Sequence, residues 1–260
     1  MMGKVLVVVL DGASFVLANT FLWYMPNVKK LFHGFHRKLM YVDDIPITPT
    51  VLCSMFTGRS SREHGVYGFK HLRKGGEILG RCKCQFVWTL AKRRGKQVRV
   101  LNVPVEIPPV NLNVDISGTD WLDNWLPPKD RFEEAVRKYH AMVLRNVKQP
   151  FDLFITWYPI PDQAHHHFFQ TISNEEQFRK FTYWYDLAFR FAWELINASR
   201  AEKWLVVSDH GLISDFESYN IGGFRQHVHI RDALAVTNSP PAPEHPREVY
   251  NWIIRNIGLG

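Results

Sequence analysis

An apolar segment, Trp204–Ser208, runs directly into Asp209-His210-Gly211, and this junction constrains the fold more than any other feature of the chain. A short apolar run of this kind predicts a strand buried in a sheet. A carboxylate and an imidazole at its end are costly to bury unless they are paired or bind a metal. In open α/β sheets, ligands bind at the carboxyl ends of the strands. The junction therefore predicts an α/β protein with a metal site at that end of its sheet.

Two other apolar segments end in the same way. Val5–Leu10 is followed by Asp11, and the segment 152–158 leads to Asp162 and His166. Because the carboxyl ends of parallel strands meet at the same edge of a sheet, we expect these side chains to lie close together. Three strand ends of this kind predict a metal centre to which the whole sheet contributes.

Short apolar runs alternate with helical patterns along the chain. This alternation predicts an α/β fold with a largely parallel central sheet and helices on both faces. The predicted strands are 4–10, 98–102, 151–157, 203–208 and 233–237. The predicted helices are 26–33, 86–94, 130–147, 174–198 and 246–256. Asp130 and Glu133 have the spacing of a capping box at the start of the third helix.

The length of 260 residues predicts a single domain, 1–260, with little room for a cap. The segment 104–128 is rich in proline and contains two tryptophans, which predicts a long loop on the substrate side of the sheet. No apolar run reaches the roughly 18–20 residues of a transmembrane span, so we expect no membrane partner. The apolar run Val5–Leu10 is short and ends at an Asp, which favours a strand over a signal peptide.

The chain has three cysteines, Cys53, Cys82 and Cys84, and this odd number argues against a disulfide scaffold. Cys82 and Cys84 lack the second ligand pair of a zinc ribbon. The cysteine content therefore predicts a cytoplasmic protein.

The net charge of +7 predicts anionic ligands. Basic residues cluster at 59–62, 70–74 and 92–96. We favour a surface that attracts small phosphorylated substrates, with nucleic-acid binding as the less favoured alternative. The sequence leaves the oligomeric state open.

A longer series of motifs extends this pattern through most of the chain. Thr48-Pro49 precedes Thr57-Gly58 by nine residues, and His64-Gly65 follows. Together with Leu-Asp-Gly at 10–12, Asp162-x-x-x-His166, Asp209-His210-Gly211 and a late His229, this order resembles the alkaline-phosphatase superfamily. The most similar branch is that of the type I phosphodiesterases and nucleotide pyrophosphatases. The resemblance covers residues 4–70, 96–118 and 150–238.

The resemblance implies a site for phosphoryl transfer that binds two divalent metal ions. Carboxylate and imidazole ligands suit zinc, with manganese or iron as alternatives. Two such ions can stabilise the attacking and the leaving oxygen of an in-line displacement. The resemblance assigns one ion to Asp11, Thr48, Asp209 and His210, and the other to Asp162, His166 and His229. It also makes Thr48 the nucleophile, because metal coordination lowers the pKa of a threonine hydroxyl.

Neighbouring residues offer alternatives for some of these roles. Thr50 is a second hydroxyl, but the nine-residue spacing favours Thr48. His227 would share a strand face with His229, which we prefer as the last ligand. We expect His64 to be structural, because the family does not use it as a ligand.

The family places an Asn, which binds a phosphoryl oxygen, at the position of Phe69. Its absence leaves this contact to the metals, to backbone N–H groups or to basic side chains, and we assign Arg59, Phe69 and Lys70 to substrate binding. Aromatic residues in 119–125 and 157–169 predict an apolar mouth that fits a second ester group on phosphorus.

These features predict a metal-dependent phosphohydrolase that cleaves phosphodiesters through a phospho-threonine. The alternatives are a phosphomonoesterase or phosphomutase using the same site, and a basic metal-binding protein without catalytic activity. A sulfatase is disfavoured, because Thr48 and Leu52 stand where the sulfatase motif has Cys and Arg.

Overall fold

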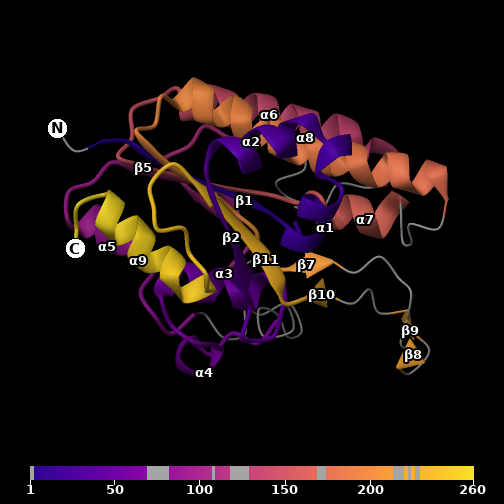
Figure 1. Ribbon diagram of the computed structural model, residues 1–260. Helices are drawn as coiled ribbons and strands as arrows, with labels where there is room; N and C mark the ends of the chain where they lie inside the picture. The colour runs from indigo at the N-terminus through magenta and orange to yellow at the C-terminus, as the bar shows by residue number, and fades with distance from the viewer. Residues whose placement is uncertain are drawn as a thin grey trace.

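The computed structural model describes residues 3–68, 82–106, 109–117, 129–168, 174–212, 220–221, 224–225 and 229–260. A seven-stranded sheet forms its centre, with the strand order β2-β11-β6-β1-β5-β3-β4 (Figure 1). The strands are β1 (Val5–Leu10), β2 (His36–Tyr41), β3 (Val98–Val103), β4 (Val110–Leu112), β5 (Leu153–Tyr158), β6 (Lys203–Val207) and β11 (Asp232–Thr237).

The central strands β6, β1, β5 and β3 run parallel, and β11 and β4 flank them in the antiparallel direction. Leu10 at the end of β1 lies beside Tyr158 at the end of β5, and Val9 lies beside Val207 at the end of β6. The three chain segments that follow these strands therefore leave the sheet at the same edge.

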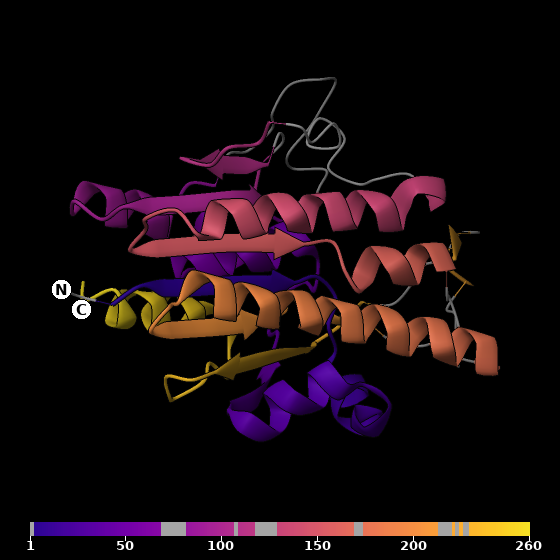
Figure 2. The ribbon, with the colours of Figure 1, turned by 90° about the horizontal axis from the view of Figure 1, so that it is seen from above.

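Helices cover both faces of the sheet, as the alternating pattern predicts (Figures 1 and 2). One face packs against α1 (Phe15–Thr20), α2 (Pro26–Gly34), α6 (Phe132–Val147) and α8 (Glu175–Ser199). The other face packs against α3 (Thr48–Thr57), α5 (Val87–Arg93) and α9 (Pro246–Asn256). Alternate residues of β1 enter the two cores, with Leu6 and Val8 in one and Val5 and Val7 in the other. Both faces of β1 are thus buried, which explains its continuous apolar sequence.

Shorter elements complete the described part of the chain. They are η1 (Leu22–Tyr24), α4 (Ser61–His64), η4 (Lys129–Arg131), α7 (Asp162–Phe168), β7 (Gly211–Leu212), β8 (Asn220–Ile221), β9 (Phe224–Arg225) and β10 (His229–Ile230). β7 and β10 pair antiparallel outside the main sheet, and α7 follows β5. Both chain termini lie at the opposite end of the molecule from α7 (Figures 1 and 2).

All five predicted strands and all five predicted helices are present, with bounds that differ by at most two residues. The capping box predicted at Asp130 is wrong, because a 3-10 turn, η4, precedes α6 and shifts its N-cap to Arg131. Glu133 then lies in the second helical position and accepts hydrogen bonds from Arg137 and Tyr183 instead.

Part of the predicted loop 104–128 is an edge strand, β4, which pairs with β3. Residues 107–108 and 118–128 of this segment lie outside the described residues. In the described part of the chain, no helix is both long enough and apolar enough to cross a membrane.

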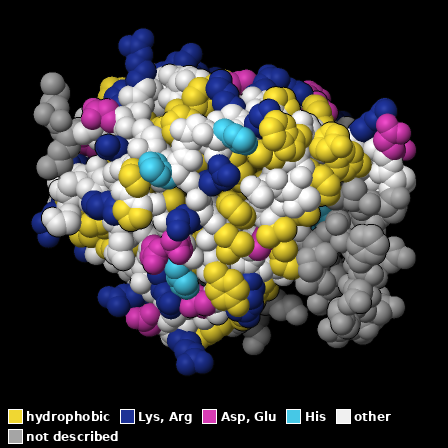
Figure 3. Space-filling model, viewed as in Figure 1, with side chains coloured by type: hydrophobic (Ala, Val, Ile, Leu, Met, Phe, Trp, Pro, Cys, Tyr) yellow, Lys and Arg dark blue, Asp and Glu magenta, His cyan; other side chains and the backbone are white. Residues whose placement is uncertain are grey.

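On the face shown in Figure 3, Lys and Arg side chains are interspersed with Asp and Glu. Among the described residues, several Lys and Arg side chains pair with Asp or Glu, as Lys38 does with Glu244 at 2.6 Å.

Candidate metal centre

The first group of donor atoms is buried where β1 and β6 end. Asp11 follows β1, Asp209 and His210 follow β6, and Thr48 is the first residue of α3. His210 Nε2 lies 3.3 Å from Asp11 Oδ1 and 3.5 Å from Asp209 Oδ2. Thr48 Oγ1 lies 3.4 Å from Asp11 Oδ1 and 3.3 Å from His210 Nε2. All four residues of this group are buried: the exposed fractions of the residues are 4% for Asp11, 3% for Thr48 and 0% for Asp209 and His210.

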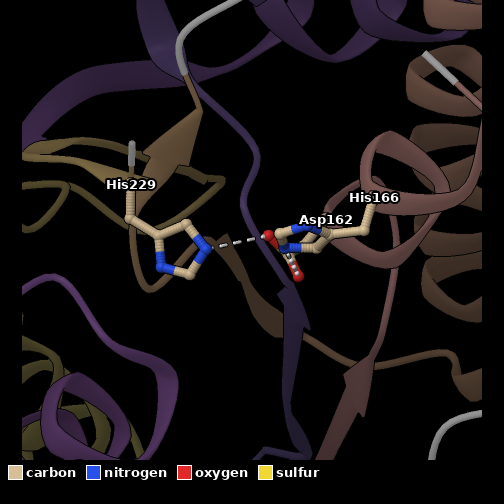
Figure 4. Close-up of side chains that lie close together, drawn as sticks. All are labelled: Asp162, His166 and His229. Carbon is tan, nitrogen blue, oxygen red and sulfur yellow. Dashed lines mark ion pairs between the residues drawn. The ribbon is translucent and has the colours of Figure 1, made fainter. Parts of the chain in front are cut away.

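The second group lies beside the first and is formed by Asp162 and His166 on α7 and by His229 on β10. Asp162 Oδ2 is 3.4 Å from His166 Nε2, and Asp162 Oδ1 is 3.4 Å from His229 Nε2. Figure 4 shows the two imidazoles pointing at the carboxylate from opposite sides. The His210 and His229 rings stack with centroids 4.0 Å apart, so the two groups are adjacent.

A backbone contact sets the orientation of the His229 ring. Its Nδ1 lies 3.0 Å from the carbonyl oxygen of Pro46, which accepts a hydrogen bond and so assigns the proton to Nδ1. The other ring nitrogen, Nε2, then faces Asp162. A hydrogen bond of this kind is the usual way in which a protein orients a metal-binding histidine.

Glycines in two of the sequence motifs allow the strand ends to approach one another. Gly12 has a φ of 70°, and a Cβ on it would lie 2.8 Å from Cβ of Asp162. Its N–H also donates a hydrogen bond of 3.2 Å to Asp209 Oδ1. A Cβ on Gly211 would lie 2.2 Å from Oδ1 of Asp232. Any larger residue would therefore push the donor segments apart.

The pKa values of Asp11, in the first group, and Asp162, in the second, are shifted in opposite directions. Burial and the nearby charges of Asp209 and Asp162 raise the pKa of Asp11 well above its usual value. Burial also acts to raise the pKa of Asp162, but the adjacent imidazoles of His166 and His229 outweigh it and bring the pKa well below its usual value. The first group is thus short of positive charge.

Both groups fit a divalent cation. Within each group the three His and Asp donor atoms lie within 4.8 Å of one another. Asp209 Oδ2 and Asp162 Oδ1 are buried and have no hydrogen-bond partner among the described residues. Buried carboxylate oxygens of this kind are satisfied by a bound metal. Imidazole and carboxylate donors suit zinc, manganese or iron.

A hydrogen-bond network that the sequence analysis missed supports the segment after Asp11. The hydroxyl of Tyr185, on α8, accepts from Ser14 N at 3.1 Å and donates to Gly12 O at 3.3 Å. Ser208 Oγ donates to Ala13 O at 2.6 Å. In the sequence, Tyr185 belongs to an apolar stripe of α8, and only the approach of that helix to the loop reveals its polar role.

The seven predicted metal ligands come together in the predicted sets of four and three, but other predicted residues do not join them. Arg59 is exposed at the far end of α3 from Thr48, where it pairs with Glu63 at 3.2 Å. Phe69, Lys70 and the alternative ligand His227 lie outside the described residues.

The neighbours weighed against the predicted ligands have different surroundings. Thr50 Oγ1 is buried and has no hydrogen-bond partner among the described residues. His64 Nδ1 accepts a hydrogen bond of 3.1 Å from Val66 N, and its Nε2 lies 3.0 Å from Ser54 Oγ. His64 therefore connects α3 to the segment that follows α4, which agrees with a structural role.

The predicted aromatic mouth is wrong for the part of 157–169 that the structure describes. Trp157 and Tyr158 are fully buried in the two cores. Phe168 stacks on Trp184 with ring centroids 5.6 Å apart. Alternate residues of a central strand point into opposite cores, so these rings are used for packing. The segment 119–125 lies outside the described residues.

A family model described as type I phosphodiesterase / nucleotide pyrophosphatase matches residues 5–256. The chain belongs to this family. No curated protein matches it by sequence. Membership agrees with the motif order that led from Asp11 through Thr48 to His229.

Solved structures of proteins with several different activities have the same fold. An inactive threonine-to-alanine variant of murine ectonucleotide pyrophosphatase/phosphodiesterase 5, in complex with AMP, matches with a TM-score of 0.63 at 11% identity, covering 99% of this chain and 96% of that one. A putative sulfatase from Bacteroides thetaiotaomicron matches with a TM-score of 0.67 at 6% identity, covering 100% and 72%. Phosphonoacetate hydrolase from Sinorhizobium meliloti 1021, in complex with phosphonoformate, matches with a TM-score of 0.57 at 17% identity, covering 81% and 57%. At these identities the likeness shows the alkaline-phosphatase-like fold.

Proposed function

We propose that this protein is a two-metal phosphohydrolase that cleaves phosphate esters through a phospho-threonine on Thr48. The observation that carries the proposal is the position of Thr48 Oγ1, 3.4 Å from Asp11 Oδ1 and 3.3 Å from His210 Nε2. Membership of the phosphodiesterase family supports phosphoester hydrolysis. The inactivity of the threonine-to-alanine variant of the murine protein supports a threonine nucleophile.

In this proposal, Asp11, Thr48, Asp209 and His210 hold one divalent ion, and Asp162, His166 and His229 hold the other. Zinc is the expected ion, with manganese or iron as alternatives. Bound ions would supply the positive charge that offsets charge developing on the oxygens of the reacting phosphate.

The chain itself orients and activates the nucleophile. The Thr48 hydroxyl donates towards Asp11 Oδ1, which directs an oxygen lone pair away from that carboxylate. Thr48 is also the first residue of α3, and the positive end of the helix dipole favours an anionic Oγ there. Burial of the group excludes bulk water from the hydroxyl.

The proposed reaction has two displacements at phosphorus. In the first, the Thr48 hydroxyl loses its proton and the bond from Oγ to phosphorus forms, while the bond from phosphorus to the leaving oxygen breaks and that oxygen takes up a proton to leave as the alcohol. In the second, a water oxygen bonds to phosphorus and the bond to Oγ breaks, which regenerates Thr48 and releases the phosphate product. Each carboxylate of the donor groups is unchanged at the end.

For the substrate, we propose a phosphodiester, on the strength of the family to which the chain belongs. The test compares bis(4-nitrophenyl) phosphate with 4-nitrophenyl phosphate in the presence of zinc or manganese. We expect kcat/KM to be about tenfold higher for the diester, equivalent to about 1.4 kcal/mol. An equal or reversed preference favours a phosphomonoesterase or phosphomutase. Tight metal binding with no turnover of either ester favours a non-catalytic metal-binding protein.

A further inference from the structure

Asp232 is the first residue of β11 and belongs to neither donor group, although it lies three residues after His229. Its Oδ2 accepts a hydrogen bond of 2.8 Å from Ser14 Oγ and one of 3.0 Å from Val16 N. Ser14 is the N-cap of α1 and lies three residues after Asp11. One oxygen of Asp232 therefore connects the segment that begins at His229 to the loop that follows Asp11.

The other oxygen of Asp232 faces the segment that carries His210. Gly211, the next residue, lies so close that a Cβ on it would collide with Oδ1 and with the backbone oxygen of Asp232. Gly211 also pairs with Ile230, where β7 meets β10. Asp232 Oδ1 is buried and has no hydrogen-bond partner among the described residues. The carboxylate thus lies between the segments that follow β1 and β6.

Capping of α1 does not by itself account for a carboxylate at this position. Ser14 Oγ already accepts a hydrogen bond of 3.0 Å from Leu17 N, as an N-cap residue does. A buried carboxylate oxygen without a donor costs free energy. What Asp232 adds is contact among three chain segments, each of which contributes a metal-donor residue: Asp11, His210 and His229.

We propose that Asp232 is a positioning residue that fixes the distance between the two donor groups. The inference rests on the proposed function, in which each group holds an ion. Asp11 belongs to the first group and His229 to the second, and Asp232 connects their segments through Ser14. Replacing a residue that holds metal ligands in place typically weakens metal binding by roughly 10- to 100-fold.

The experiment titrates zinc into the metal-free full-length protein in competition with a chromophoric chelator. We expect Asp232→Ala to weaken binding of the ion held by His229 about tenfold, because the removed carboxylate lies in the same chain segment. Asp186→Ala is the matched control, since Asp186, on α8, accepts a hydrogen bond of 2.7 Å from Asn27 N in the first turn of α2. It belongs to neither donor group, and its loss should leave both zinc affinities unchanged. Unchanged affinity in Asp232→Ala, or an equal loss in Asp186→Ala, would overturn the proposal.

Two further variants separate positioning from folding, which circular dichroism monitors. Asp232→Asn keeps an oxygen that can accept from Ser14 and Val16, so it should restore most of the zinc affinity that Asp232→Ala loses. An equal loss in both variants would contradict the proposed contact. If Asp232→Ala does not fold, Ser14→Ala tests the same connection, because it removes the hydroxyl that donates to Asp232. It should weaken the same zinc ion, and unchanged affinity would overturn the proposal.

Turnover of the nitrophenyl esters separates this inference from the proposed function. If the wild-type chain binds two zinc ions but cleaves neither ester, the phosphohydrolase proposal fails. The zinc titrations still decide the role of Asp232 in that case, because they measure binding and not activity.

Discussion

The two donor groups lie side by side at one edge of the sheet, yet they differ in burial and in charge. His210 is fully buried, whereas the side chains of His166 and His229 are 29% and 22% exposed. The first group has two carboxylates and one imidazole, and the second has one carboxylate and two imidazoles. In the first group the carboxylates repel one another, and in the second the imidazoles compensate for the carboxylate.

In the proposed function, this difference would give the two groups different tasks. The buried, strongly negative group should hold its cation tightly and keep the nucleophile beside it. The more exposed group should exchange its cation more readily and face the substrate. Three predictions test this comparison.

The largest effect should come from the nucleophile, which belongs to the first group. We expect Thr48→Ala to lower kcat by about 10³-fold or more, because losing the nucleophile closes the covalent route. Thr50→Ala is the matched control, since it removes a buried hydroxyl from the same helix, and it should keep most of the activity. Steady-state kinetics on the nitrophenyl diester and circular dichroism of both variants check this. If Thr50→Ala were the inactive variant, the nine-residue spacing would have selected the wrong threonine.

The two groups should differ by about tenfold in their affinity for a divalent ion, and metal removal measures this difference. The extra carboxylate and deeper burial of the first group increase its attraction for a divalent ion. We therefore expect two equivalents of metal at saturation, of which the one held by His229 is lost first during titration with a chelator. Elemental analysis should find one tightly held equivalent in His229→Gln and one weakly held equivalent in Asp209→Asn. The reverse order of affinities would contradict the comparison.

The smallest effect concerns the stability of the metal-free protein. The pKa of Asp11 is raised, so ionising it costs stability, and this cost grows as the pH rises from about 4 towards the raised pKa. The pKa of Asp162 is lowered, so its ionised form stabilises the fold above its unfolded pKa, and that contribution is lost as the pH falls towards the lowered pKa.

At neutral pH in chelator, Asp11→Asn should therefore raise Tm and Asp162→Asn should lower it. A change of 1 kcal/mol corresponds to about 2–4 °C in a chain of this size. Differential scanning calorimetry of both variants and the wild-type chain measures the two shifts. A decrease of Tm in both variants would mean that charge does not distinguish the groups.

The elements that the sequence predicted are those whose apolar residues follow a regular spacing and are also buried in the structure. β1 and α8 are examples, because an apolar run and an apolar stripe each specify one partner surface. β2 was missed because only Met40 of that edge strand is buried, so its sequence shows no apolar run. α3 was missed because its first residues, Thr48, Pro49 and Thr50, are typical of turns.

In the candidate site, too, some residues were predicted from the sequence and others were not. The motif order and its family resemblance identified the donor residues, and their grouping in the structure agrees with the predicted sets. Arg59 was assigned to substrate binding because it is basic and close in sequence, but α3 carries it away from Thr48. Tyr185 was missed because its hydroxyl reaches the Asp11 loop only through the packing of α8.

By itself, the sequence determined the α/β class and the strands whose ends carry acidic residues, and its family resemblance singled out the candidate donor residues. The first two depend on a local period or on the cost of burying a charged group, and both can be read along the chain. The tertiary structure decided which side chains face one another, which carboxylates repel, and that Trp157 and Tyr158 serve the cores instead of a substrate mouth. These properties depend on distances between segments far apart in sequence, and strand order and helix packing alone determine those distances.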